Sequence, residues 1–134
     1  MSWARKALLL AGGFFAAAAV AGCSGEPPSD ATIVFHYSRF ISDVVTVRAG
    51  VPVTFTLRND DPIEHEWIVG PSEVHDRHRV GTEPVHDQLP NEVTVPALST
   101  RRTTLTFAKP GEYAFICHLP GHEAYGMRGT LRVS

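Results

Sequence analysis

Short runs in which apolar and polar residues alternate dominate the chain from Thr32 onward. These runs are rich in Val, Thr, Ile and aromatic residues, and a period of two places successive side chains on opposite faces of a β-strand. Turn-forming residues separate many of them, as at Ala49-Gly50 and at Lys109-Pro110-Gly111. The pattern predicts about eight short strands. They span residues 32–37, 44–49, 51–59, 66–70, 92–98, 101–107, 112–117 and 129–134.

The same part of the chain keeps no helical period for long, and its connections are too short to carry crossover helices between parallel strands. We therefore expect an all-β domain, an antiparallel sandwich or barrel of about eight strands. The long segment from Pro71 to Asn91 is the exception to the strand pattern. It is polar and irregular, and loops of this length in compact domains are usually functional or mobile.

The first 22 residues have the pattern of an export signal. Arg5 and Lys6 precede an apolar run from Ala7 to Val20, which is short for a membrane span and ends in small residues. The sequence Val20-Ala21-Gly22-Cys23 resembles the lipobox of bacterial lipoproteins, in which the Cys becomes the lipid-carrying mature N-terminus. The resemblance implies lipidation at Cys23 and an extracytoplasmic protein anchored to a bacterial membrane. A plain secretory signal with an unmodified Cys is the alternative.

Residues 23–31 are polar and rich in Gly, Pro and Ser, which is typical of a flexible tether. We expect residues 32–134 to form the folded domain. Loss of Arg5 and Lys6 with the signal changes the formal net charge from −2 to −4, and an acidic domain is a poor partner for nucleic acid. Lipidation of Cys23 would leave Cys117 without a disulfide partner, so we expect its thiol to be buried or to bind a metal.

Soft and borderline metal donors gather in the stretch ICHLPGHEAYGM, residues 116–127. Cys117 ends a predicted strand, and His122 and Met127 follow with four residues between each pair. His65 precedes another predicted strand and could supply a second imidazole from a different loop. One thiolate, two imidazoles and one thioether suit copper in both of its oxidation states. Zinc would more often take further Cys or His residues in place of Met.

The Cys-x4-His-x4-Met motif, the upstream His and the predicted β-sandwich together resemble the cupredoxins, the small blue-copper proteins such as plastocyanin and azurin. The resemblance covers nearly the whole predicted domain. It implies a Greek-key fold and electron transfer through the exposed imidazole edge of His122. The implied ligands of one type 1 copper ion are His65, Cys117, His122 and Met127. An apolar docking patch around the imidazole edge would consist of Leu119, Pro120, Ala124 and Tyr125.

One departure from the cupredoxin pattern directly follows the upstream His. Many cupredoxins have Asn at this position, where it steadies the copper-binding loop and hydrogen-bonds the thiolate, but this chain has Glu66. A carboxylate that pointed inward would repel a thiolate, so we expect it to turn outward or to alter the potential of the site. Asn59 is one candidate for the role of the missing Asn.

A second departure is His118, which directly follows Cys117 as in the multicopper oxidase motif Cys-His-x3-His-x4-Met. That family has a further His before the Cys, where this chain has Ile116, and its paired His-x-His motifs are missing from this sequence. A cysteine nucleophile would need a base and an orienting group around an exposed thiolate, whereas the best partners of Cys117 occupy metal-ligand positions. We therefore expect no enzyme activity and interpret His118 as an exposed residue at the end of a strand.

The segment from Pro71 to Asn91 contains His75, His78 and His86. The first two could share one face of a helical turn, and acidic residues lie nearby. One hypothesis is therefore a second, exchangeable metal site among His75, His78, His86 and His118. The alternative is a solvated polar loop with scattered His residues, which the composition of the segment favours.

Two functions remain from the sequence. We expect a membrane-tethered copper protein that carries single electrons between extracytoplasmic redox partners, one of which docks near His122. The alternative is a copper-binding module for copper delivery, storage or resistance that receives metal through its His-rich loop. In either case we expect a monomer that contacts the membrane through its lipid and binds no nucleic acid.

Overall fold

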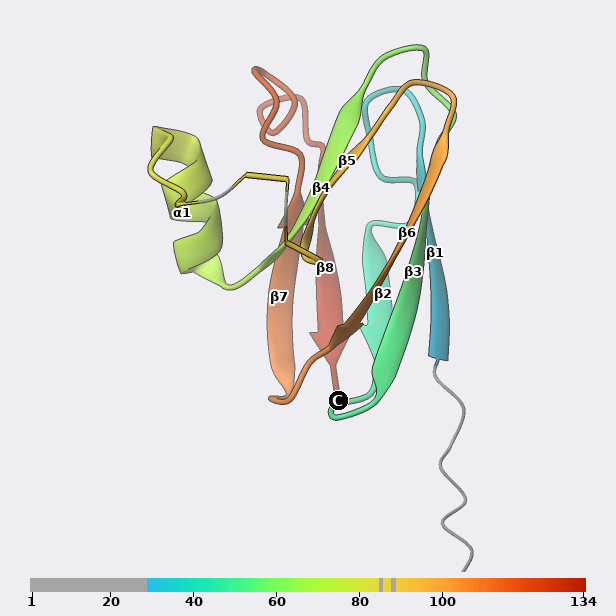
Figure 1. Cartoon of the computed structure of the whole chain (residues 1–134), viewed down its shortest axis with the longest axis vertical. Helices are drawn as coiled ribbons and strands as arrows, with labels where there is room; N and C mark the ends of the chain where they lie inside the picture. Colours follow the sequence, from blue (N-terminus) through green and yellow to red (C-terminus); the bar gives the residue numbers. More distant parts are fainter. Residues whose placement is uncertain (1–28, 85, 88) are drawn as a thin grey trace, which may run out of the picture.

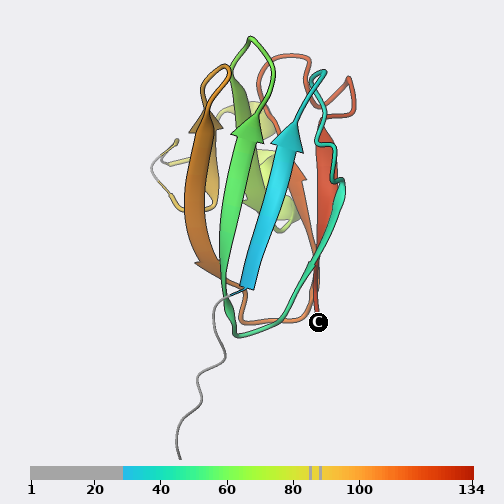
Figure 2. The same ribbon diagram turned by 90° about the vertical axis from the view of Figure 1, so that its right-hand side faces the viewer.

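The computed structural model describes residues 29–134 except 85 and 88. These residues form two β-sheets that face each other, with a helix outside the larger sheet (Figures 1 and 2). The predicted all-β sandwich of eight strands is confirmed, and every strand begins and ends within three residues of its predicted range. The elements are β1 (Ser29–Phe35), β2 (Val44–Val47), β3 (Pro52–Asn59), β4 (His65–Gly70), α1 (Ser72–Val80), β5 (Glu92–Val95), β6 (Thr100–Thr106), β7 (Gly111–Ile116) and β8 (Arg128–Val133).

The domain starts slightly earlier than the sequence pattern indicates. Ser29 to Ala31, which the sequence analysis assigned to the tether, already pair with Val53 to Phe55 of β3. The predicted export signal, the lipidation site Cys23 and the remainder of the tether lie outside the described residues. Within the part of the chain that the structure describes, no helix is long and apolar enough to cross a membrane.

The strand order is β1-β3-β6 in the smaller sheet and β2-β8-β7-β4-β5 in the larger one. Four of the six pairings are antiparallel, but β1 pairs with β3 and β2 pairs with β8 in parallel. The expectation of an antiparallel sandwich needs correction at these two pairs. The chain reverses at each connection, so β1 and β3 run in the same direction. They become neighbours because β2, between them in sequence, crosses to the other sheet.

The hydrophobic core lies between the two sheets. Along β3 the buried residues alternate with more exposed ones, and Val53, Phe55 and Leu57 face inward. The ring centroid of Phe55 lies 4.9 Å from that of Trp67 on the opposing sheet, a contact of the kind that dominates core energetics. All six residues of β4 are buried. The inner face of this strand packs on the core, and α1 lies over its outer face (Figure 1).

The segment from Pro71 to Asn91 begins with α1, which the sequence analysis did not predict. Gly81 ends the helix with a φ of 63° and donates its N–H to the carbonyls of Arg77 and His78. The buried residue of this helix is His75 rather than a row of apolar residues. Hydrophobic periodicity was therefore a poor guide here, because the helix packs on the sheet through polar rings.

The loops after β1, β3, β5 and β7 lie together at one end of the sandwich, the upper end in Figure 1. We call residues 36–43, 60–64, 96–99 and 117–127 the loop end. Main-chain hydrogen bonds tie the loop after β3 to its neighbours: Asp60 N–H donates to O of Phe35 at the end of β1 (2.9 Å), and Leu98 N–H in the loop after β5 donates to Asp61 O (3.0 Å). Segments far apart in the sequence therefore form one connected surface at this end.

Candidate metal centre

The loop between β7 and β8 folds back so that its two ends meet. The Cys117 N–H donates to Met127 O (3.1 Å), and the Met127 N–H donates to His122 O (3.0 Å). The His122 N–H in turn donates to Leu119 O (3.0 Å), which closes a turn at Pro120-Gly121. These bonds convert the linear spacing of the motif into a compact loop.

Three of the predicted ligands converge at the loop end. Nδ1 of His65 lies 3.2 Å from Nδ1 of His122, and Sγ of Cys117 lies 3.3 Å from the same nitrogen. The three ligand atoms all lie within 4.8 Å of one another. His65 and Cys117 are fully buried, and His122 is half-buried. Met127 is fully buried, and its main chain bonds both other members of the motif. The site is therefore closed to solvent except beside His122.

The chemical state of Cys117 favours a metal ligand over a nucleophile. Burial raises the pKa of its thiol to about 11, although hydrogen bonds from the N–H groups of Glu66 and Leu119 act in the opposite direction. At neutral pH the thiol therefore stays protonated until a cation displaces the proton. A buried thiol facing two imidazoles matches the soft and borderline donor set of a copper site.

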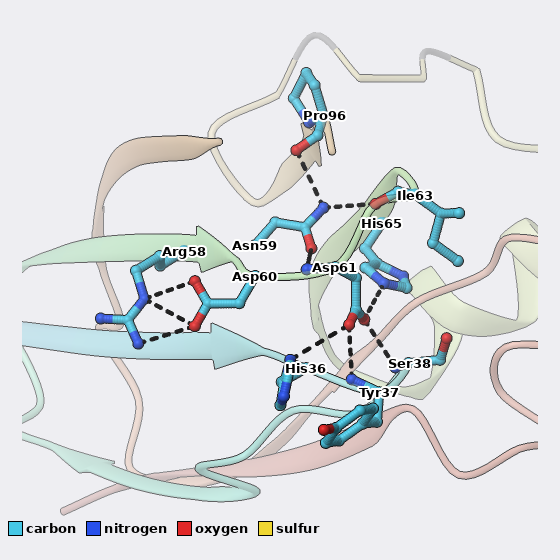
Figure 3. Close-up of polar contacts among 10 residues, drawn as sticks. All are labelled: His36, Tyr37, Ser38, Arg58, Asn59, Asp60, Asp61, Ile63, His65 and Pro96. Carbon is cyan, nitrogen blue, oxygen red and sulfur yellow. Dashed lines mark hydrogen bonds and ion pairs between the residues drawn. The ribbon is translucent and has the colours of Figure 1, made fainter. Parts of the chain in front are cut away.

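Asp61 holds His65 in place, a role that was not predicted from the sequence. Its Oδ2 lies 2.8 Å from Nε2 of His65, and its two oxygens accept hydrogen bonds from the N–H groups of Tyr37 and Ser38, each at 2.8 Å (Figure 3). Burial opposes ionisation of this carboxyl, but the hydrogen bonds from His65 and the two N–H groups outweigh it and hold its pKa below the usual value. The carboxylate fixes the tautomer that leaves Nδ1 of His65 free for a metal. Its position four residues before the His was the available signal.

Asn59 supports the same loop instead of bonding the thiol. Its Nδ2 donates to the carbonyls of Ile63 (2.7 Å) and Pro96 (3.1 Å), and its Oδ1 accepts the Asp61 N–H (Figure 3). The same Nδ2 also donates to Val95 O (3.1 Å). These bonds tie the loop after β3 to the loop after β5. Asn59 therefore contacts no ligand directly. It fixes the main chain at Asp61, which in turn orients His65.

Glu66, which stands where many cupredoxins have Asn, contacts the Cys117 sulfur through its main chain and turns its carboxylate away. Its main-chain N–H donates to Sγ of Cys117 (3.3 Å), so the backbone supplies a bond to the sulfur without an Asn side chain. Its carboxylate is buried and lies 3.0 Å from Nε2 of His86. Side chains alternate along β4, and Trp67 lies in the core, so the Glu66 carboxylate is on the outer face of the sheet.

His118 is buried, which corrects the expectation of an exposed strand end. Its side chain is only 6% exposed, and its Nε2 lies 3.0 Å from Nδ1 of His75 on α1. The other nitrogen of His75 lies 3.2 Å from Ala114 O. Burial lowers the pKa of both rings, to about 4 for His118. The two neutral rings therefore attach α1 to the end of β7.

The expectation of a solvated His-rich loop is also wrong for two of its three histidines. His75 is buried, and the side chain of His78 is 2% exposed and stacks on His118 at a centroid distance of 5.3 Å. His86 remains partly exposed. Of the four histidines in the hypothetical second site, His78 and His86 come together with Glu83, while His75 and His118 bond each other.

Known proteins similar to this chain include copper proteins. A profile of the family described as "Cupredoxin-like domain" matches residues 7–133. A copper-resistant cuproprotein CopI of Rubrivivax gelatinosus is 33% identical over 98 residues, which are 71% of this chain and 59% of that protein. A protein of the same name from Pseudomonas aeruginosa is 27% identical over 122 residues, at 66% and 67% coverage. The chain therefore spans little more than half the length of the Rubrivivax relative.

Solved structures of auracyanins share the fold. Auracyanin A, a "blue" copper protein of Chloroflexus aurantiacus, superposes with a TM-score of 0.66 at 26% identity over 81% of this chain and all of its own length. Reduced auracyanin of Roseiflexus castenholzii gives a TM-score of 0.66 at 21% identity, with 79% of this chain and 97% of that chain covered. At the latter identity the likeness concerns the fold alone.

Proposed function

Because the chain belongs to the family of cupredoxin-like domains, we propose that it binds one copper ion in a type 1 site and carries single electrons outside the cytoplasm. The observation that carries the proposal is the convergence of the Cys117 thiol with the imidazoles of His65 and His122. Met127, the fully buried last residue of the same loop, is the proposed fourth ligand. Bound copper would supply one-electron exchange between its two oxidation states.

The surroundings of the ligands suit repeated electron transfer. His65 is fixed through Asp61, and the sulfur of Cys117 receives the Glu66 N–H. The ligand loop is closed by its own main-chain bonds. Because these groups are fixed by the fold, the ligands keep similar positions in both oxidation states, and little rearrangement accompanies electron transfer.

The loop end also offers a surface for a redox partner. Five large apolar side chains at this end are exposed: Tyr37 (80%), Ile41 (58%), Ile63 (47%), Leu98 (72%) and Tyr125 (72%). Within the predicted docking patch Pro120, Ala124 and Tyr125 are exposed, while Leu119 packs partly against the core. Exposed apolar residues gathered beside a half-buried ligand favour docking of a protein partner near His122.

The cellular setting of the proposal comes from the sequence. The export signal and the lipidation of Cys23 would place the domain outside the cytoplasm on a lipid anchor. The tether would let the domain reach a partner with its loop end. N-terminal mass spectrometry of the protein from its native membrane tests this part, and an unmodified N-terminus other than Cys23 would contradict it.

Copper resistance is the second candidate function. It is favoured by the two relatives described as copper-resistant cuproproteins. A copper-buffering or copper-delivering protein would use the same ligands but would release the ion to an acceptor. Reduction in the presence of a Cu(I) chelator separates the two functions: an electron carrier keeps its copper through several cycles of reduction and oxidation, whereas a delivery protein loses it.

The visible spectrum of the copper-loaded domain tests the type 1 site directly. We expect Cu(II) to produce an intense charge-transfer band that disappears on reduction and returns on oxidation. The band should be absent from Cys117→Ser and retained in Cys23→Ser, a matched control in the same purified chain of residues 23–134. A band that survives Cys117→Ser, or no band in the parent protein, would contradict the proposed site.

A further inference from the structure

A second group of metal-binding side chains lies beside α1, outside the larger sheet. His78 on α1, together with Glu83 and His86 in the following segment, brings ligand atoms within 4.8 Å of one another. Glu92, the first residue of β5, adds a carboxylate whose Oε2 lies 3.5 Å from Nε2 of His78. This group shares no residue with the type 1 ligands.

Both imidazoles are held with one nitrogen free. Nδ1 of His78 lies 2.8 Å from Val74 O, so this nitrogen carries the proton and Nε2 keeps its lone pair. Nε2 of His86 lies 3.0 Å from the carboxylate of Glu66, so it donates its proton there and Nδ1 keeps its lone pair. Hydrogen bonds of this kind, to a carbonyl or a carboxylate, orient histidines that bind metals.

The free atoms of the group have no hydrogen-bond partners. Among the described residues, Nε2 of His78, Oε2 of Glu83 and Oε2 of Glu92 are buried and form no hydrogen bond. The side chains of His78 and Glu92 are 2% and 6% exposed. Buried polar atoms without partners are costly, and buried carboxylates more so. A cation bound between His78 and Glu83 would supply a partner for their free atoms, and its positive charge would stabilise the neighbouring Glu92 carboxylate.

Two distances within the group match those between ligands of one metal ion. Nε2 of His78 lies 3.5 Å from Oε2 of Glu92, and Nδ1 of His86 lies 3.5 Å from Oε1 of Glu83. These separations are long for hydrogen bonds. Two atoms that each lie about 2.1 Å from a tetrahedral ion are about 3.4 Å apart. We propose that His78, Glu83 and His86 bind a divalent transition-metal ion, with Glu92 beside the His78 ligand.

The chemistry of the donors defines the class of ion. Two imidazoles with carboxylates form an N/O set that suits Zn²⁺ and Cu²⁺, and the absence of a thiolate or thioether among these residues makes it a poor site for Cu⁺. The partly exposed His86 gives the ion a route from solvent. This site therefore exchanges divalent ions with the medium, in contrast to the enclosed type 1 site.

Glu66 lies between the two sites. Its carboxylate orients His86, and its main-chain N–H bonds the sulfur of Cys117. His118, the neighbour of Cys117, stacks on His78. The replacement of the usual Asn by Glu66 is therefore explained by the second site. An Asn side chain would support the type 1 site alone, whereas the Glu66 carboxylate orients His86, a ligand of the second site.

Metal binding by a protein that lacks two of the four type 1 ligands tests the proposal. In the background Cys117→Ser/His122→Ala, we expect calorimetry to show one Zn²⁺ per chain, or one Cu²⁺ with the electron paramagnetic resonance spectrum of an ordinary N/O site. Separate titrations with the two ions identify the preferred one. Adding His86→Ala or Glu83→Gln should weaken binding at least tenfold. Adding Glu112→Gln, an exposed carboxylate that pairs with Arg132, should leave binding unchanged.

No binding in the folded background, or binding that neither variant weakens, would overturn the proposal and leave an ion-pair network in its place. If circular dichroism shows that the background protein is unfolded, metal is counted in the wild-type protein instead. There we expect two equivalents for the wild type and one for His86→Ala/Glu83→Gln, and equal counts would overturn the proposal. These assays do not depend on the visible band. A negative result for the second site can therefore be distinguished from a negative result for the type 1 site.

Discussion

Asp61 and His65 are joined by a hydrogen bond of 2.8 Å between Oδ2 and Nε2, and the opposite nitrogen of the ring faces His122 at 3.2 Å. The carboxylate is itself fixed by two main-chain N–H groups at the start of the loop after β1. The orientation of His65 therefore depends on the loop after β1 and on the loop after β3 that carries Asp61, and the Asp61–His65 pair connects both to the loop of His122.

Asp61→Asn should weaken copper binding. The amide oxygen can accept at most two of the three hydrogen bonds, and the NH2 group would face the remaining N–H donor. The amide also lacks the charge that stabilises the His65 N–H. Loss of such an outer partner typically costs about 10- to 100-fold in metal affinity. Competition titration against a chelator of known affinity measures the effect. Asp60→Asn, an exposed neighbour that pairs with Arg58, is the matched control, and an equal loss there would contradict the role of Asp61.

Tyr125→Glu should slow electron exchange with the physiological partner while leaving the copper site intact. Tyr125 is 72% exposed in the ligand loop, so a charge is tolerated there but disfavours an apolar docking contact. Stopped-flow kinetics should show a several-fold slower second-order rate with an unchanged visible band. Val80→Glu, also largely exposed but on α1, is the control, and equal rates for both variants would argue against docking at the loop end.

The stability of the metal-free protein should fall on acidification through the His75–His118 pair. Burial lowers the pKa of His75 in the folded protein below its usual value of 6.5. Between the lowered pKa and pH 6.5, the unfolded chain therefore binds a proton that the folded chain does not. The contribution of this group is fully present above pH 6.5 and is lost as pH falls below it. Urea unfolding at pH 7.5 and pH 5 should show a smaller acid loss for His75→Gln than for the wild type. An identical loss would mean that other groups carry the pH dependence.

Gly129→Ala should destabilise the domain. A Cβ at this position would overlap the ring of Phe115, its cross-strand partner, and would lie 2.7 Å from Asp43 O. The backbone contact leaves no room for relief, and overpacking of this kind typically costs about 1–3 kcal/mol. Chemical denaturation measures the loss. Arg132→Ala on the same strand removes only an exposed ion pair and should change stability by less than about 1 kcal/mol.

The strands could be predicted because their pattern is local. Val53, Phe55 and Leu57 alternate with polar residues, and this alternation by itself indicates a half-buried strand. Helix α1 could not be predicted in the same way, because its buried residue is His75, which bonds His118 in the loop after β7 and Ala114 on β7. Its packing surface depends on residues about 40 positions away in the sequence, so no local period marks it.

The type 1 ligands were predicted from their types and spacing, and three of them do converge in the fold. The supporting partners were not. Asp61 and the main-chain N–H of Glu66 reach the ligands through the pairing of β4 with β7 and through contacts between loops. An aspartate in a turn can have many roles, so Asp61 alone did not indicate a ligand partner. A backbone N–H is present in nearly every residue, so the sequence cannot show which one bonds the sulfur.

The sequence by itself determined the strands, the donor set and its soft character, because each of these depends on residue type and short spacing. Only the tertiary structure decided which histidines lie together: His65 with His122, His75 with His118, and His78 with His86. The physical reason is that these pairs are made by strand order and by the packing of α1 on the sheet. Such contacts satisfy polar groups across distant segments, and the free energy that selects them comes from burial of the whole domain.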